Sequence, residues 1–356
     1  MKRVISYFIG LLFLAFLTVF LIGCPLQKKP GSTTPNENNG NNGNGTAPQA
    51  RVYVSGYYTG ASNDVAAYWI DDSNSKVILY DQGPARVYAL QIVGGIVYTA
   101  GYFNSGGNDV ACCWKDTTKI NLTGGVSSRA FGINVYNGSV YVAGYYNDGT
   151  NDIACYWKDG VKTDLPGGSP AYAYDIFYSG ASLYIAGYYR SGNDIACYWK
   201  DGVKTDLSGG TNTYAYGLYV DGSDIYVTGT SWNPAPVACY WKNGVQVTLP
   251  VGSFSESRDI FIVNGSIYIA GYYKNADLKE VACYWKNDSA GVVDLYNSTT
   301  DNAEAHSIYI NGNDIYVSGF YNSGSTNTAC YWKNGARTDL YAGGNSDAYS
   351  ITVSYQ

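Results

Sequence analysis

Charged side chains are scarce in this chain of 356 residues, and those present are mostly acidic. Lys, Arg, Asp and Glu together make up 14% of the chain, with 22 basic against 28 acidic residues and no cluster of basic ones. Nucleic-acid binding and adhesion to anionic lipid both depend on concentrated basic groups. The composition therefore argues against both kinds of electrostatic partner.

Histidine and the common catalytic motifs are also lacking. His306 is the single histidine, and the sequence contains no hydrolase elbow, phosphate-binding loop, zinc-protease helix motif or sialidase aspartate box. No histidine or second cysteine stands at zinc-ligand spacing from the repeated cysteines described below. The sequence thus predicts no cofactor and no metal, and it favours a protein that is not an enzyme.

Only one long apolar run is present, and it lies at the N-terminus. A short basic head precedes the apolar stretch 4–22, which leads into Leu21-Ile22-Gly23-Cys24. This arrangement resembles a bacterial lipoprotein signal with its lipobox. The resemblance implies a signal peptide over 1–23 and a lipidated, palmitate-bearing Cys24 that anchors the chain to a membrane of the cell envelope. The alternative is an uncleaved anchor, because nineteen residues can just span a bilayer.

The segment that follows predicts a tether. Residues 24–50 are rich in Asn, Gly and Pro and contain almost no apolar side chains. Such a segment cannot offset the entropy lost on ordering. We therefore expect it to be disordered and to hold the folded part, 51–356, outside the cytoplasm, in the periplasm or on the cell surface.

A repeated tryptophan predicts the fold. The phrase Ala-Cys-Tyr-Trp-Lys recurs with variations, and its tryptophans are separated by 45, 43, 42, 42, 44 and 47 residues. They are Trp69, Trp114, Trp157, Trp199, Trp241, Trp285 and Trp332. Seven units of forty-odd residues are typical of a β-propeller with four strands per blade. The predicted fold is all-β: a monomeric seven-bladed β-propeller of four antiparallel strands per blade.

The repeat that contains Trp199 shows the expected blade. Asp201-Gly202 is a two-residue hairpin signal between its last two strands. The four strands are expected at 173–178, 183–189, 194–200 and 203–207. The folded part opens on a second strand, 52–58, and closes on a first strand, 348–353, so that the two ends should complete one shared blade and leave no free sheet edge.

One stretch resembles a known propeller repeat. Asn137–Tyr146, followed by Ile153–Trp157, is similar to the kelch repeat and, more loosely, to the WD repeat. Kelch blades have a glycine pair where this chain has Gly-Tyr, and their later tryptophan is missing here. The resemblance implies a propeller and carries over no kelch partner or activity.

Three recurrent positions are predicted to be structural. One is a cysteine two residues before the tryptophan, expected to be a small packing residue: Cys112, Cys155, Cys197, Cys239, Cys283 and Cys330, with Cys113 as an extra. Another is a glycine inside the second strand, expected to make room for a tryptophan or for an aromatic of the next blade: Gly56, Gly101, Gly144, Gly187, Gly229, Gly271 and Gly319. The last is an acidic residue before the third strand, expected in an Asx-type turn rather than a calcium site: Asp64, Asp109, Asp152 and Asp194.

Candidate binding residues are few. Tyrosines follow the repeated glycine in pairs, and aromatic faces beside polar loops suit sugar recognition. The candidates in these pairs are Tyr58, Tyr146, Tyr188, Tyr189 and Tyr273. Arg258 and His306 replace aromatic residues of the first strands, which should line the central channel. The alternative is that the tyrosines only fill space between blades and that His306 is a packing residue.

These patterns lead to one functional hypothesis and two alternatives. The hypothesis is a membrane-tethered, extracytoplasmic binding scaffold for a protein or a glycan. One alternative is a structural or assembly lipoprotein of the envelope. The other is an enzyme, a hydrolase or lyase, with its site at the channel mouth near Arg258 and His306.

Overall fold

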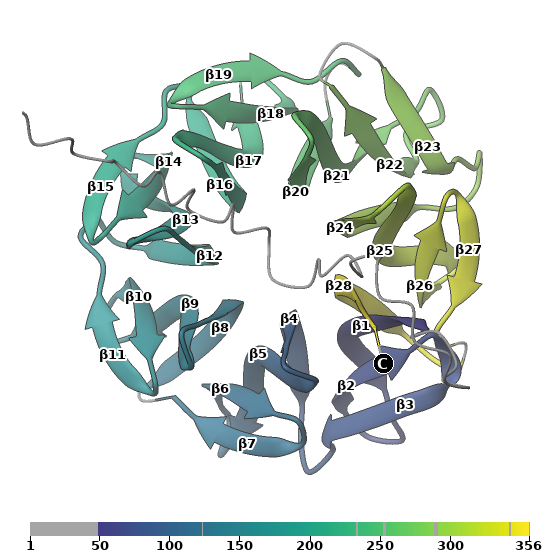
Figure 1. The fold of residues 1–356 in the computed structure, drawn as a ribbon, viewed down its shortest axis with the longest axis horizontal. Coiled ribbons are helices and arrows are strands. Elements are labelled where there is room, and N and C mark those ends of the chain that lie inside the picture. The colour runs from purple at the N-terminus through teal and green to yellow at the C-terminus, as the bar shows by residue number, and fades with distance from the viewer. Residues whose placement is uncertain are drawn as a thin grey trace, which may run out of the picture.

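Seven four-stranded sheets stand in a ring around a central channel (Figure 1). The computed structural model describes residues 49–122, 124–232, 234–251, 254–287, 291–341 and 343–355. These residues form 28 strands and no helix, so none of them lies in a helix that could cross a membrane. The predicted seven-bladed β-propeller is confirmed, whereas the predictions for residues 1–48 lie outside the described residues.

The strands occupy four positions in each blade, counted outward from the channel. The innermost strands are β4 (Ala85–Val93), β8 (Ser127–Tyr136), β12 (Ala171–Ser179), β16 (Asn212–Asp221), β20 (Ser255–Val263), β24 (Ala303–Asn311) and β28 (Ser346–Tyr355). The second strands are β1 (Ala50–Thr59), β5 (Ile96–Ser105), β9 (Ser139–Asn147), β13 (Ser182–Ser191), β17 (Asp224–Trp232), β21 (Ser266–Lys274) and β25 (Asp314–Ser323).

The outer two positions of each blade follow in the same order. The third strands are β2 (Asp64–Ile70), β6 (Asn108–Lys115), β10 (Asp152–Lys158), β14 (Asn193–Lys200), β18 (Pro236–Lys242), β22 (Glu280–Lys286) and β26 (Thr326–Lys333). The outermost strands are β3 (Asp72–Tyr80), β7 (Thr118–Asn121), β11 (Val161–Asp164), β15 (Val203–Asp206), β19 (Val245–Thr248), β23 (Val292–Tyr296) and β27 (Ala336–Asp339). Blade 1 is β28-β1-β2-β3, and blades 2 to 7 follow in chain order.

Blade 1 closes the ring with strands from both ends of the chain. β28 pairs antiparallel with β1 from Ala50↔Tyr355 to Tyr58↔Ser346, as the phase of the repeat predicts. The innermost position of this blade is therefore filled by the last strand of the chain. Closure of this kind pairs strand edges that would otherwise be open to other chains.

The repeated tryptophans and cysteines form the core between blades. All seven tryptophans of the repeat are at most 1% exposed, and the cysteines of the third strands are buried free thiols. Residues two apart in a strand share a face, which is why each Cys-x-Trp pair is buried together. Burial raises the pKa of Cys113 to about 11, so this thiol stays protonated at neutral pH. Their predicted role as packing residues is confirmed.

The glycine of the second strand makes room mainly for backbone and, in two blades, also for the ring of the repeated tryptophan. A Cβ at Gly187 would overlap the carbonyl oxygen of Tyr172 on the innermost strand of the same blade, and Gly101 meets the carbonyl of Arg86 in the same way. Trp199 is a secondary neighbour, with its Cζ3 3.0 Å from such a Cβ. The predicted tryptophan of the neighbouring strand therefore does lie beside this space, but the backbone of the innermost strand, which has a bulge here, is its nearest occupant.

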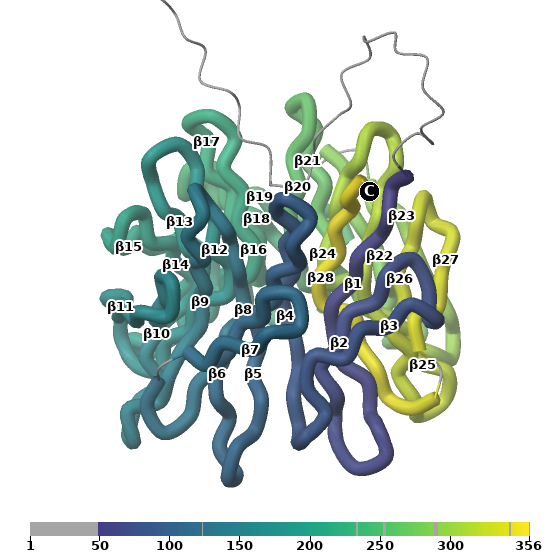
Figure 2. Tube along the Cα trace, turned by 60° about the horizontal axis from the view of Figure 1, so that its bottom comes forward, coloured from purple at the N-terminus to yellow at the C-terminus, as the bar shows by residue number. Residues whose placement is uncertain are grey.

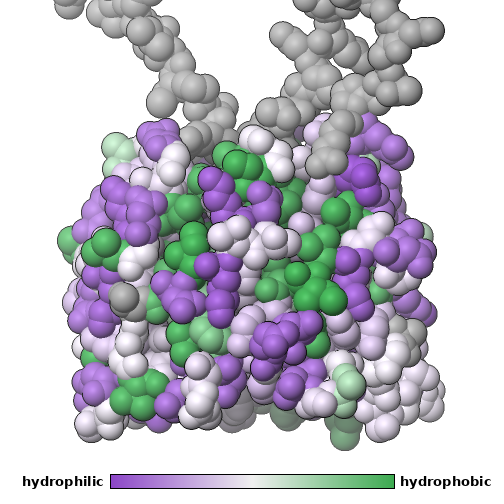
Figure 3. Space-filling view, turned by 90° about the horizontal axis from the view of Figure 1, so that it is seen from below, coloured by the Kyte–Doolittle hydropathy of each residue, from purple (hydrophilic) through white to green (hydrophobic). Residues whose placement is uncertain are grey.

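The N-terminal end of β1 and the start of the innermost strands lie at opposite ends of the ring. Ala50 pairs with Tyr355, whereas the loop after β1 lies beside Ser346, where β28 begins (Figure 2). We call the end of the channel at which the innermost strands begin the mouth. On the side wall shown in Figure 3, apolar and polar residues are interspersed.

Candidate functional site

A β-bulge in every innermost strand directs one side chain into the channel. In blade 2 the register passes from Val87↔Gly101 to Ala89↔Ala100, which leaves Tyr88 outside the ladder. The residues at this position, which we call the bulge residues, are Tyr88, Phe131, Tyr174, Tyr216, Arg258, His306 and Tyr349. Bulges commonly re-aim side chains at functional sites. Here they line a cavity of about 150 Å³ in the channel.

The bulge residues contact one another around the channel. Their ring centroids lie at 4.9 Å (Tyr349–Tyr88), 5.2 Å (Tyr88–Phe131), 4.8 Å (Phe131–Tyr174), 5.5 Å (Tyr174–Tyr216) and 5.2 Å (His306–Tyr349). The guanidinium of Arg258 lies 4.9 Å from the Tyr216 ring. Burial raises the pKa of Tyr88, Tyr174 and Tyr349, so these phenols are neutral. The result is a belt of aromatic surface interrupted by one cation and one imidazole.

Two residues before each bulge residue, toward the mouth, lies a second circle of side chains. These mouth residues are Arg86, Arg129, Tyr172, Tyr214, Glu256, Glu304 and Asp347. In blades 2 to 5 they are cations and phenols, whereas in blades 6, 7 and 1 they are carboxylates. The mouth is therefore electrostatically asymmetric although the blades are alike.

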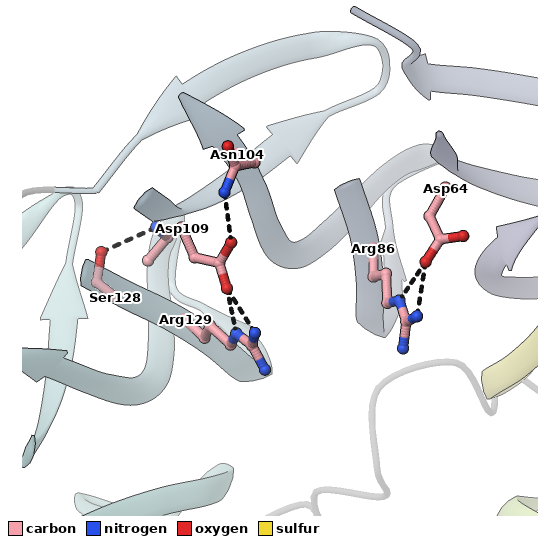
Figure 4. Close-up of polar contacts among 7 residues, drawn as sticks. Asp64, Arg86, Asn104, Asp109, Ser128 and Arg129 are labelled. Atoms are coloured by element: carbon pink, nitrogen blue, oxygen red, sulfur yellow. Dashed lines mark hydrogen bonds and ion pairs between the residues drawn. The ribbon is translucent and has the colours of Figure 1, made fainter. Parts of the chain in front are cut away.

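The cations and phenols of the mouth bind the recurrent acidic residues of the preceding blade. Arg86 contacts Asp64 at 2.6 Å, and Arg129 donates to Asp109 at 2.7 Å through Nε (Figure 4). The hydroxyls of Tyr172 and Tyr214 donate at 2.6 Å to Asp152 and at 2.7 Å to Asp194. The predicted role in Asx-type turns is wrong for these four aspartates. Their carboxylates instead bind side chains of the next blade, and these side chains come close only because the blades are arranged in a ring.

The carboxylate half of the mouth surrounds Arg258 and His306. Arg258 Nη2 lies 2.8 Å from Glu256 and 3.8 Å from Glu304, and His306 Nε2 lies 3.1 Å from Asp347 Oδ1 without the alignment of a hydrogen bond. Burial raises the pKa of Glu304, although His306 and Arg258 oppose this. The structure thus brings together the two polar residues singled out in the sequence. Asp347 was missed, although it occupies the same repeat position as the two glutamates.

The paired tyrosines face in opposite directions. The residues directly after the repeated glycine, our inward series, pack toward the mouth. Tyr188 is half-buried there, 5.8 Å from the Tyr174 ring and 4.8 Å from the Tyr214 ring. Elsewhere in the series the guanidiniums of Arg86 and Arg129 lie over the rings of Tyr57 and Tyr102. Tyr188 is the candidate tyrosine that lies beside the bulge residues.

The next residues, our outward series, pack against the outermost strand of their own blade. Tyr58, Tyr146 and Tyr189 are at most 8% exposed, with lysine ammonium groups 3.7, 3.0 and 3.3 Å from their ring centroids. Tyr273 is half-buried and donates its hydroxyl to Asp294 at 3.0 Å. These four candidates therefore lie apart from Tyr188, Arg258 and His306.

The imidazole makes the stability of the protein depend on pH. Burial lowers the pKa of His306, but Asp347 and Glu304 outweigh burial and raise it, whereas Arg258 opposes them. The stabilisation is complete below the ordinary pKa of about 6.5 and is lost as pH rises through the raised value. We expect the melting temperature to fall across this interval in the wild type, and not in His306→Phe, which places there the residue found at Phe131. Proton NMR of the single histidine reads the pKa directly, and a value below 6.5 would contradict the argument.

The mouth is equipped to hold a polar ligand. The bulge residues line the cavity with aromatic rings, one guanidinium and one imidazole, and the carboxylates of the mouth form ionic contacts with the last two groups. Among the described residues, no group of three or more His, Cys, Asp or Glu side chains could hold a metal ion. The side chains of the mouth are suited to stacking, hydrogen bonding and charge pairing.

Similar solved structures bear on the fold alone. No protein-family model and no curated protein matches the chain. A structure of prolyl endopeptidases is 12% identical with a TM-score of 0.51, covering 87% of this chain and 50% of that one. An ulvan lyase of polysaccharide lyase family PL25 is 10% identical with a TM-score of 0.48, covering 74% and 81%. The tricorn protease is 10% identical with a TM-score of 0.49, covering 88% and 36%. This chain thus spans half or less of the two proteases.

Proposed function

We propose that this protein is a non-enzymatic binding scaffold of the bacterial cell envelope, lipid-anchored through Cys24, which takes a glycan ligand at the mouth of its propeller. The single observation that carries the proposal is the set of seven bulges, which turn aromatic, arginine and histidine side chains toward one cavity. The residues that depart from the repeat gather where a ligand would enter.

The chemistry of the mouth supports a sugar-containing ligand. Tyr188 and Tyr214 are half-buried at the mouth, and a tyrosine ring of this kind can stack against the apolar face of a pyranose. Glu256, Glu304 and Arg258 supply charged acceptors and donors at the same mouth. Few polar groups placed around aromatic surface are the usual composition of small-ligand sites.

The position of the N-terminal end of β1 supports a membrane tether. Ala50 lies at the end of the ring opposite the mouth, so a tether formed by the preceding residues would leave the mouth directed away from the membrane. A scaffold held in this way could receive ligands from the surrounding space. A monomeric propeller suffices for this role.

We expect Tyr188→Ala to weaken glycan binding by roughly fivefold, because one aromatic stacking contact is worth about 1 kcal/mol. The measurement is a glycan array, followed by titration calorimetry, with the full chain in detergent micelles. Tyr178→Ala is the matched control, since Tyr178 is also half-buried and stacks on a tyrosine, Tyr136, but lies at the far end of its strand from the mouth. If the wild type bound no glycan on the array, the proposal of a glycan ligand would be wrong. A protein partner would then be sought by pull-down from envelope extracts.

A further inference from the structure

The tyrosines of the outward series make the same set of contacts in blades 3 and 4. In blade 4 the Tyr189 ring lies against Gly167 and Gly168 of the link from blade 3. Lys204 places its ammonium 3.3 Å from the ring centroid, and Asp206 accepts the phenolic hydroxyl at 3.0 Å. In blade 3 the equivalent contacts are made by Lys162 at 3.0 Å and Asp164 at 3.0 Å around Tyr146. Ring, lysine and aspartate together fill the space between the link and the outermost strand.

Blade 5 changes all three side chains at once. Ser231 stands in place of the tyrosine, Gln246 pairs with Trp241 as Lys204 pairs with Trp199, and Thr248 pairs with Cys239 as Asp206 pairs with Cys197. The two link glycines are kept as Gly209 and Gly210. The result is a cavity of about 380 Å³ lined by Gly209, Gly210, Ser231, Val237, Gln246 and Thr248.

The size of this cavity suits a small ligand. Its volume lies within the roughly 300–1,000 Å³ that ligand sites usually enclose. Its lining residues belong to the link before blade 5, the end of β17, the start of β18 and the end of β19, all at the end of the ring where the mouth lies. Its residues are distinct from the mouth residues and the bulge residues. A ligand bound here would therefore be bound independently of one at the channel.

The lining is polar and uncharged. The carboxamide of Gln246 and the hydroxyl of Thr248, which share one face of β19, and the hydroxyl of Ser231 on β17 offer donors and acceptors. Ser231 Oγ accepts a hydrogen bond from the Gly210 amide at 2.9 Å, which leaves its own proton to donate. Val237 and the glycines supply the apolar part. The described lining residues include no charged side chain, so a charged ligand would not be neutralised.

We propose that this pocket in blade 5 binds a neutral hexopyranose, as a terminal sugar of a glycan. A pyranose carries several hydroxyls around its edge and can engage all three polar side chains, while its C–H groups contact Val237. A phenolic side chain of a peptide would fit the space but would bring one hydroxyl for three polar partners. Polar groups of a site that a ligand leaves unpaired disfavour that ligand. This pocket is separate from the channel mouth, so sugar binding here does not depend on ligand binding there.

The decisive variant introduces into blade 5 the tyrosine, lysine and aspartate that fill this space in blade 4. In Ser231→Tyr/Gln246→Lys/Thr248→Asp the pocket is filled by side chains that already coexist in blades 3 and 4. The probes are methyl α-glucopyranoside and methyl α-galactopyranoside, titrated into the full chain in detergent and followed by saturation-transfer NMR and calorimetry. We expect the wild type and the control Tyr178→Ala to bind at least one glycoside, and the triple variant to bind it at least tenfold more weakly.

Folding of the triple variant is checked by its melting temperature, which should equal or exceed that of the wild type because a cavity is filled. If the variant does not fold, Gln246→Ala keeps the pocket open and should weaken binding about fivefold to tenfold. The proposal is overturned if the wild type binds neither glycoside, or if the filled pocket binds as well as the open one. Binding of N-acetyltyrosinamide in place of the sugars would overturn the sugar class. Loss of glycoside binding in Tyr188→Ala alone would assign the sugar to the mouth.

Discussion

Replacing Gly187 with alanine is expected to lower the free energy of unfolding by about 3 kcal/mol or more. The added Cβ would overlap the carbonyl oxygen of Tyr172 and approach Trp199 Cζ3 at 3.0 Å. A flexible side chain could move aside, but here the backbone of the innermost strand must shift. That shift would also undo the bulge that directs Tyr174 into the channel.

Urea unfolding of the full chain in detergent measures the effect. Gly83→Ala is the matched control, since its Cβ would come no closer than 3.4 Å to any neighbour. We expect this control to stay within about 0.5 kcal/mol of the wild type. If Gly187→Ala were as stable as Gly83→Ala, the close approach of the two strands would be incorrect.

Removal of β28 is expected to abolish the folded monomer. A chain ending at Asn345 loses the innermost strand of blade 1, with the buried side chains of Ala348, Ile351 and Val353. It also exposes the whole edge of β1, which would pair with other chains. The loss should exceed the total stability of about 5–15 kcal/mol that domains of this kind possess.

Circular dichroism and size-exclusion chromatography test this result. A chain ending at Ser354 is the matched control, because it gives up only the last ladder pair, Ala50↔Tyr355, and the hydrogen bond between Asn311 and the Tyr355 hydroxyl at 2.9 Å. It should remain monomeric and lose about 1 kcal/mol. Cooperative unfolding of the chain that ends at Asn345 would show that the shared blade is not needed for closure.

The pocket in blade 5 can be traced in the sequence to three repeat positions that change together. Lys204 and Asp206 stand two apart in the outermost strand of blade 4, as Lys162 and Asp164 do in blade 3. In blade 5 the same positions are Gln246 and Thr248, and the tyrosine they would cover is Ser231. Three coordinated changes in one repeat therefore pointed to a local change of structure. The sequence could not show that the space remains open as a cavity.

The sequence by itself determined the number of blades, their four-stranded plan and the shared blade. These follow from local rules: the spacing of the tryptophans, the alternation of side chains along a strand and the Asp-Gly turn at residues 201–202, both with positive φ. Local rules depend only on neighbours in the chain, so they can be read without the fold.

Only the tertiary structure decided which side chains meet at the mouth. The bulge at Tyr88 depends on the register between two strands, and the pairing of Arg86 with Asp64 depends on how closely adjacent blades approach. The glycine at position 187 indicated a close contact in the sequence, but only the structure shows that the carbonyl oxygen of Tyr172 is the nearest atom. The site is built from such contacts between strands and blades, whose geometry is set by closure of the ring as a whole.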